Sequence, residues 1–87
     1  MKIVKRSGKI VDFSMDKIKT SIETSACDIN FSLTSSDINI LMDDLSSLLI
    51  NLRSEDGLTS SFEVRGLIYE VMMKHGFKDV CRSYMNL

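Results

Sequence analysis

Residues 3–18 read IVKRSGKIVDFSMDKI. The short mixed runs of apolar and polar residues at 3–6 and 10–13 predict two β-strands. Ser7 and Gly8 lie between them and predict the corner of a hairpin, because glycine adopts positive φ without steric cost. Ser14 follows the second strand and predicts the N-cap of a helix. This stretch therefore predicts a hairpin that leads directly into a helix.

The first two predicted helices follow from apolar residues at helical spacing. The helix after Ser14 is expected to face inward through Met15, Ile18, Ile22, Ala26 and Ile29. The next helix has the longest apolar stripe, made of Ile38, Leu41, Met42, Leu45, Leu48, Leu49 and Leu52. Its N-cap candidates are Thr34, Ser35 and Ser36. A turn is expected to end it at Ser54, Glu55, Asp56 and Gly57.

Two further helices are predicted in the last third of the chain. Ser60 and Glu63 have the spacing of a capping box, which predicts the start of the third helix. Its inward face is expected to contain Val64, Leu67, Ile68, Val71 and Met72. Gly76 is expected to close this helix, just after His75 at its carbonyl end. The fourth helix presents one side made of Phe77, Val80, Cys81 and Tyr84.

These elements predict one domain over residues 1–87. Its fold class is α+β but mainly α, a four-helix bundle capped by a short N-terminal β-hairpin. At this length the chain can bury only about 60–65% of its unfolded surface, so the core is modest. The residues of the hairpin turn, the second strand and the first helical turn are expected to border the same opening of the domain.

Charge is distributed unevenly along the chain. Residues 1–19 contain six basic and two acidic side chains, a net charge of +4, whereas the whole chain has a net charge of −1. Lys17 lies in the first turn of a helix, where a cation opposes the helix dipole at a cost of about 0.3–1 kcal/mol. A bound anion at this helix N-terminus would convert that cost into an advantage. The segment is thus a candidate phosphate site, although a solvated basic surface would have the same composition.

The same residues resemble a known family. The run VKRSGKIVDFSMDKI is similar to the opening of the ATP-cone domain, and FEVRGLIYEVMMKHGFKDVCRSYM is similar to its closing helices. The pattern positions are occupied by Ile3, Lys5, Arg6, Gly8, Phe13, Lys17 and Ile18, with Val80, Cys81 and Tyr84 downstream. Ser7 departs from the family's usual Asp or Asn, and Cys81 from a common Ala.

The resemblance implies an allosteric sensor that binds ATP or dATP, with or without Mg²⁺, and regulates ribonucleotide reductase. An adenine base needs an apolar slot, which Ile3, Val4 and Val11 are placed to provide. Phosphates would meet Lys5, Arg6, Lys9 and Lys17, since arginine suits paired oxygens and lysine acts as a mobile point charge. Gly8, Ser14 and Ser61 complete the expected nucleotide-binding set. The expected partners are a reductase subunit or a second copy of the chain.

Several other functions find no matching pattern. The sequence has no Walker loop and no constellation of nucleophile and base, so a catalytic domain is not expected. Cys27 and Cys81 are expected to be buried free thiols, and with one histidine they make a zinc site improbable. Asp43 and Asp44 are expected to be an exposed acidic pair without a ligand set. No apolar run is long enough for a signal peptide or a membrane span, which favours the cytoplasm.

Two other classes of function remain open at this point. One is a helical interaction adaptor that docks an acidic partner on the basic edge. The other is a nucleic-acid-binding module, which a pI near 5.7 and the lack of interleaved aromatic residues disfavour. Apolar atoms of the last two helices are candidates for a partner surface, in particular those of Met73, Tyr84 and Met85.

Overall fold

The computed structural model describes residues 1–53 and 57–86. Their elements are, in chain order, β1 (Lys2–Val4), β2 (Ile10–Asp12), α1 (Met15–Asp28), α2 (Ser35–Arg53), β3 (Leu58–Ser60), α3 (Ser61–Lys74) and α4 (Lys78–Met85). The turn predicted after α2 falls largely on residues 54–56 and so lies outside the described residues. The prediction of a mainly helical α+β domain is confirmed.

β1 is the central strand of a mixed sheet with the order β2-β1-β3. β2 pairs antiparallel with β1 and places Val11 opposite Ile3, while Gly8 adopts a φ of +88° in the turn between them. β3 pairs parallel with β1 on its other side and places Thr59 opposite Ile3. The sequence pattern predicted a hairpin alone, which is corrected to three strands. β3 was not predicted because its three residues, which end at the N-cap of α3, are too few to show the alternating pattern of a strand.

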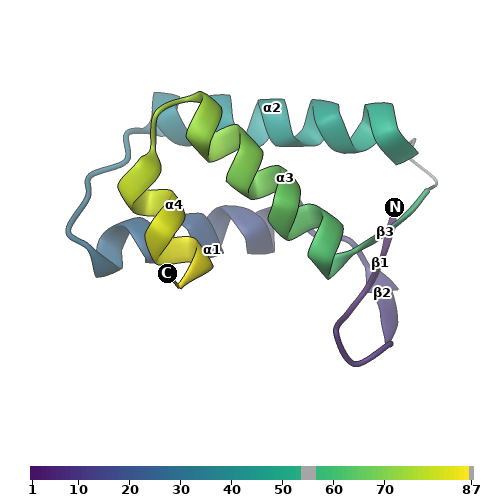
Figure 1. Cartoon of the computed structure of the whole chain (residues 1–87). Helices are drawn as coiled ribbons and strands as arrows, with labels where there is room; N and C mark the ends of the chain where they lie inside the picture. The colour runs from purple at the N-terminus through teal and green to yellow at the C-terminus, as the bar shows by residue number, and fades with distance from the viewer. Residues whose placement is uncertain (54–56, 87) are drawn as a thin grey trace.

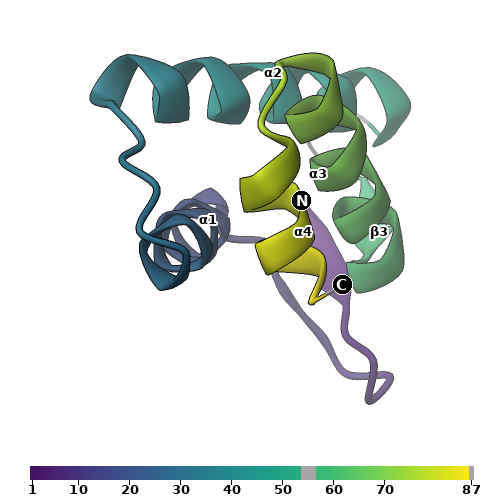
Figure 2. The ribbon, with the colours of Figure 1, turned by 60° about the vertical axis from the view of Figure 1, so that its left-hand side comes forward.

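The helices form a body with the sheet at one end (Figure 1). α3 crosses the body diagonally, packing against α2 on one side and α4 on the other (Figure 1). α4 is short and also packs against α1 (Figure 2), where the Ser83 hydroxyl donates to the Ser25 carbonyl at 2.8 Å. The helices thus cross one another rather than running side by side along their full lengths.

Side-chain caps fix where three of the helices begin. Ser14 Oγ accepts from the Lys17 amide at 3.4 Å, which confirms the predicted cap of α1. Thr34 and Asp37 exchange hydrogen bonds of 3.0 and 3.1 Å before α2. Ser60 Oγ accepts from the Glu63 amide at 3.1 Å before α3. These bonds satisfy amides that a helix N-terminus otherwise leaves without partners.

The predicted inward faces supply the core. Every residue predicted for the inner face of α3 is buried, as are Ile22 and Ala26 of α1 and Val80 and Cys81 of α4. The buried residues of α2 are Ile38, Leu41, Leu45 and Leu49. Leu52, at 56% exposure, departs from the predicted stripe because it lies in the last turn of α2. Ile29 is exposed because α1 ends one residue before it.

Three polar or sulfur-containing positions also require correction. Cys27 is exposed, so only Cys81 is the buried thiol that was predicted. Asp44 lies 2.9 Å from His75 Nε2 and 3.2 Å from Lys74 Nζ, so it joins α2 to the end of α3 instead of standing as an exposed acid. Hydrogen bonds from His75 and Lys74 lower the pKa of Asp44. Met85 is buried and contributes to the core instead of a partner surface.

Two leucines of α2 provide a matched test of this core. Leu45→Ala should lower the free energy of unfolding by about 2–5 kcal/mol, because Leu45 is 1% exposed and its removal leaves a cavity. Leu52→Ala removes the same atoms from a position that is 56% exposed and should change the free energy of unfolding by about 0.5 kcal/mol or less. Urea denaturation of both variants measures the difference. Equal losses would contradict this assignment of the core.

Candidate functional site

Two adjoining hollows lie where the sheet meets the helices. The smaller has a volume of about 190 Å³ and is bordered by β1, β2 and the first turns of α1 and α3. The larger has a volume of about 690 Å³ and is bordered by α1, α3 and the end of α4. Ser61, Arg65 and Tyr84 border both, so the two hollows form one continuous site.

The smaller hollow is mainly apolar. Ile3 and Val11 are paired across β1 and β2, so their side chains lie on the same face of the sheet. The remaining apolar lining comes from Phe13, Ile18 and Val64. A flat apolar group of modest size fits such a lining.

Two helix N-termini border the same hollow. Ser14 and Lys17 come from the start of α1, and Ser61 and Arg65 come from the first turn and a half of α3. Helix N-termini have amides without intrahelical partners and a partial positive charge, so each attracts anions. The two helix starts together favour an anionic ligand.

The Ser61 hydroxyl is the most specific feature of the site. Its Oγ is buried and has no hydrogen-bond partner among residues 1–53 and 57–86. A buried polar atom without a partner costs about 1–3 kcal/mol, and most such atoms are paired in folded proteins. Because Ser61 borders both hollows, a ligand with polar atoms would supply the missing partner.

Cationic side chains line the same two hollows as Ser61. Lys5, Lys17 and Arg65 border the smaller hollow, and Arg6 and Arg65 border the larger one. Asp12 also borders the smaller hollow, but its carboxylate is paired with Lys2. The site therefore combines an apolar slot, positive charge and a buried hydroxyl.

Most of the predicted site residues meet in these hollows. The smaller hollow contains six of them, namely Ile3, Lys5, Val11, Ser14, Lys17 and Ser61, and the larger contains Arg6 as well as Ser61. Val4 does not line either hollow, because side chains alternate along β1 and Ile3 and Lys5 point to this face. Gly8 and Lys9 lie at the exposed turn, where the Lys5 amide donates to the Lys9 carbonyl at 2.8 Å.

The family model described as "ATP cone domain" matches residues 1–87, the whole chain. The chain belongs to the ATP-cone family. As a member it is a nucleotide-binding regulatory domain, and domains of this family are generally not catalytic. Among proteins with curated functions, none matches the chain.

Arg65 is a charged residue of the candidate site in this ATP-cone domain that sequence reasoning missed. It lies four residues after Ser61 on α3, and the two therefore share a helix face. Its Nη2 donates to the Met85 carbonyl at 2.7 Å and so holds the end of α4 beside the site. The spacing to Ser61 could have identified it. The proximity of α4 could not have been derived from the sequence, because it depends on the tertiary packing.

Tyr84 approaches the site from α4. Burial raises the pKa of its hydroxyl, while the nearby Arg65 charge acts in the opposite direction. The phenol is thus neutral at physiological pH and can donate a hydrogen bond.

The charged residues of the domain do not form a metal centre within the part of the chain that the structure describes. There, no three His, Cys, Asp or Glu side chains lie close enough to hold an ion. The described helices are also too short or too polar to cross a membrane.

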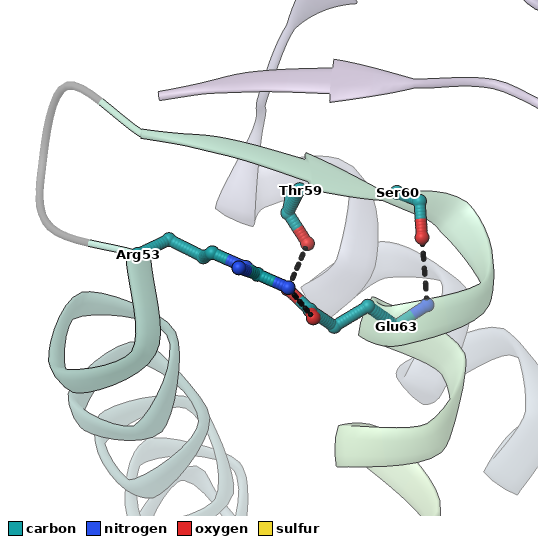
Figure 3. A network of polar contacts seen from close by, with 4 residues as sticks. All are labelled: Arg53, Thr59, Ser60 and Glu63. Atoms are coloured by element: carbon teal, nitrogen blue, oxygen red, sulfur yellow. Dashed lines mark hydrogen bonds and ion pairs between the residues drawn. The ribbon is translucent and has the colours of Figure 1, made fainter.

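The start of α3 is fixed by a network around Glu63 (Figure 3). Arg53 donates to both carboxylate oxygens, at 3.0 and 2.6 Å, and the Thr59 hydroxyl donates to one of them at 2.7 Å. The hydrogen bonds from Arg53 and then from Thr59 lower the pKa of Glu63 to about 2. Four hydrogen bonds, including the one from the Glu63 amide to Ser60, thus converge on the first turn of α3.

This network predicts a pH-dependent stability. Because the pKa of Glu63 falls from 4.5 to about 2 on folding, its stabilisation is complete above pH 4.5 and is lost as the pH falls towards 2. Glu63→Gln should lower the free energy of unfolding by about 1 kcal/mol at pH 7, a modest value because the Arg53 side chain is 48% exposed and water screens the pair.

Urea denaturation of both proteins between pH 7 and pH 2 measures this difference. The difference should shrink below pH 4.5 and nearly vanish by pH 2. Glu70→Gln changes an exposed residue of the same helix and is the matched control. A difference for Glu63→Gln that stays constant over the whole range would contradict the assignment.

Proposed function

We propose that this ATP-cone domain binds ATP or dATP in the joined hollows and serves as an allosteric sensor for ribonucleotide reductase or its regulation. The observation that carries the proposal is the buried Ser61 hydroxyl, which lacks a hydrogen-bond partner among the described residues and borders the same hollow as the start of α1 and several cations. A nucleotide has the three matching parts: a flat base, a hydroxyl-bearing sugar and an anionic tail.

The adenine base is assigned to the smaller hollow. Its lining of Ile3, Val11 and Phe13 offers apolar contact, which suits the faces of a purine. Backbone groups of the strands would then supply one or two hydrogen bonds to the edge of the base. The sugar lies at Ser61, where the two hollows meet.

The phosphates are assigned to the side of the site where the cations gather. Arg6 and Arg65 offer guanidinium forks that match paired oxygens, and Lys17 offers a point charge beside the start of α1. A Mg²⁺ ion that accompanied the nucleotide would be held by the phosphates, because Mg²⁺ commonly keeps several waters and binds phosphate oxygens. Lys9 would reach the phosphates only from the exposed turn.

Regulation requires that the nucleotide bind two states of an assembly with different affinities. The domain supplies no reaction of its own in this proposal, so the signal passes through its surface to a reductase subunit or to a second copy. We place this sensor in the cytoplasm, where the ratio of ATP to dATP reports on nucleotide supply.

The first test is nucleotide binding itself. ATP or dATP should raise the melting temperature, because a ligand of the folded state adds about 2.7 kcal/mol of stability at one hundred times its dissociation constant. Lys17→Ala should weaken binding by roughly 1–3 kcal/mol, as expected for the loss of a charge-assisted hydrogen bond. Differential scanning fluorimetry and calorimetry measure both effects.

Lys19→Ala is the matched control. It removes the same charge from the same helix, but Lys19 does not border either hollow. An oligonucleotide of equal charge tests the nucleic-acid alternative in the same titration. Millimolar nucleotide without thermal shift or heat, or equal effects of the two lysine variants, would refute this assignment of the phosphates.

The second test concerns the regulated assembly. Nucleotide should change self-association, or association with a reductase subunit, by the ~1–3 kcal/mol typical of allosteric coupling. Light scattering of the domain, alone and with the cognate reductase, measures the mass with ATP, with dATP and without nucleotide. Identical masses in every condition would reduce the domain to a passive nucleotide binder.

A further inference from the structure

Glu63 makes contacts that no direct role in binding explains. It does not line either hollow, yet its carboxylate receives three hydrogen bonds from two other elements, α2 and β3 (Figure 3). The two bonds from Arg53 use both oxygens, which is the bidentate geometry that fixes orientation as well as distance.

The third bond comes from a buried group. Thr59 is 3% exposed, and its hydroxyl donates to Glu63 Oε1 at 2.7 Å. Without that acceptor the hydroxyl would lose a hydrogen bond inside the protein, which is costly. Thr59 and Glu63 are therefore held together even though the Arg53 side chain of the same network is half exposed.

These contacts fix the chain on both sides of Ser61, the residue that borders both hollows. Glu63 is bound through its side chain to Thr59 and through its amide to Ser60 Oγ, and Ser61 lies within the five-residue span from Thr59 to Glu63. Thr59 and Ser60 are also paired with Ile3 and Val4 of β1. The network therefore sets where Ser61 stands relative to Ile3, which lines the smaller hollow.

We infer that Glu63 is a positioning residue for the nucleotide site, which acts by holding the Ser61 hydroxyl at the junction of the two hollows. This inference rests on the proposed function, because it gives Ser61 a nucleotide to contact. Arg53 and Thr59 share the role, since they fix the carboxylate from α2 and β3.

The direction of the effect distinguishes positioning from simple electrostatics. Replacing a carboxylate near an anion site by an amide removes a repulsion and leaves the Arg53 charge unpaired, so electrostatics alone would tighten nucleotide binding. A role confined to stability would leave the dissociation constant of the folded protein unchanged. Of these three explanations, only positioning predicts that Glu63→Gln weakens nucleotide binding.

The experiment is a double-mutant cycle for ATP binding, measured by calorimetry at pH 7. The proteins are the wild type, Glu63→Gln, Ser61→Ala and the double variant. Each single variant should raise the dissociation constant about threefold to tenfold. The double variant should bind no more weakly than Ser61→Ala, because Glu63 acts through the hydroxyl that this variant already lacks.

Two further variants test the same carboxylate without changing it. Thr59→Val removes one donor with little change of shape, and Arg53→Lys keeps the charge but loses the fork. Both should weaken ATP binding in the wild-type background and have no effect in the Ser61→Ala background. Glu70→Gln, an exposed change on α3, should leave the dissociation constant unchanged. Circular dichroism confirms that each variant is folded, and Arg53→Lys replaces Glu63→Gln in the cycle if the latter is not.

The outcomes separate the two proposals. A wild-type protein that binds neither ATP nor dATP overturns the proposed function and the positioning role with it. A wild-type protein that binds ATP, with Glu63→Gln binding equally or more tightly, overturns positioning alone. Additive losses in the double variant do the same, because they show that Glu63 does not act through Ser61.

Discussion

The parallel pairing of β1 with β3 is the constraint on which the site depends. It places Ile3 beside Thr59, although the two residues are 56 positions apart in the chain. β1 is followed through β2 by α1, and β3 continues directly into α3. The pairing therefore brings the first turns of two helices to one hollow, and either helix alone would offer only half of it.

This arrangement concentrates positive charge. Two helix N-termini and the side chains of Lys5, Lys17 and Arg65 border one small volume, and Asp12, the carboxylate nearby, is paired with Lys2. Such a concentration opposes folding and is relieved when an anion binds. The Ser61 hydroxyl, which has no hydrogen-bond partner in the described part of the chain, adds a second local cost of the same kind. Both the concentrated positive charge and the buried hydroxyl thus raise the free energy of the folded domain, and an anionic ligand with polar atoms would offset both costs. Such local costs are typical of functional positions.

The sequence predicted those parts that depend on local patterns. Apolar spacing located the helices, and serine caps located the starts of α1 and α3, because these signals span only a few residues. β3 was missed because its three residues are stabilised by pairing with a distant strand. The partners of Glu63 were missed for the same reason, since α2 and β3 meet α3 only in the folded chain, and so was the contact of Arg65 with the end of α4. Val4 was predicted for the site, but the alternation of side chains along β1 turns it away from both hollows.

Hydrogen bonds connect the candidate site to the ends of two other helices. The residues that line the two hollows come from the sheet, α1, α3 and α4. Arg65 connects the site to the last carbonyl of α4, and the Glu63 network connects it to the end of α2. A nucleotide that draws on Arg65 competes with the Met85 carbonyl for the same guanidinium, and phosphate forms the stronger, charge-assisted bond. Such a competition would act first on the end of α4, because Arg65 binds the carbonyl of its last residue.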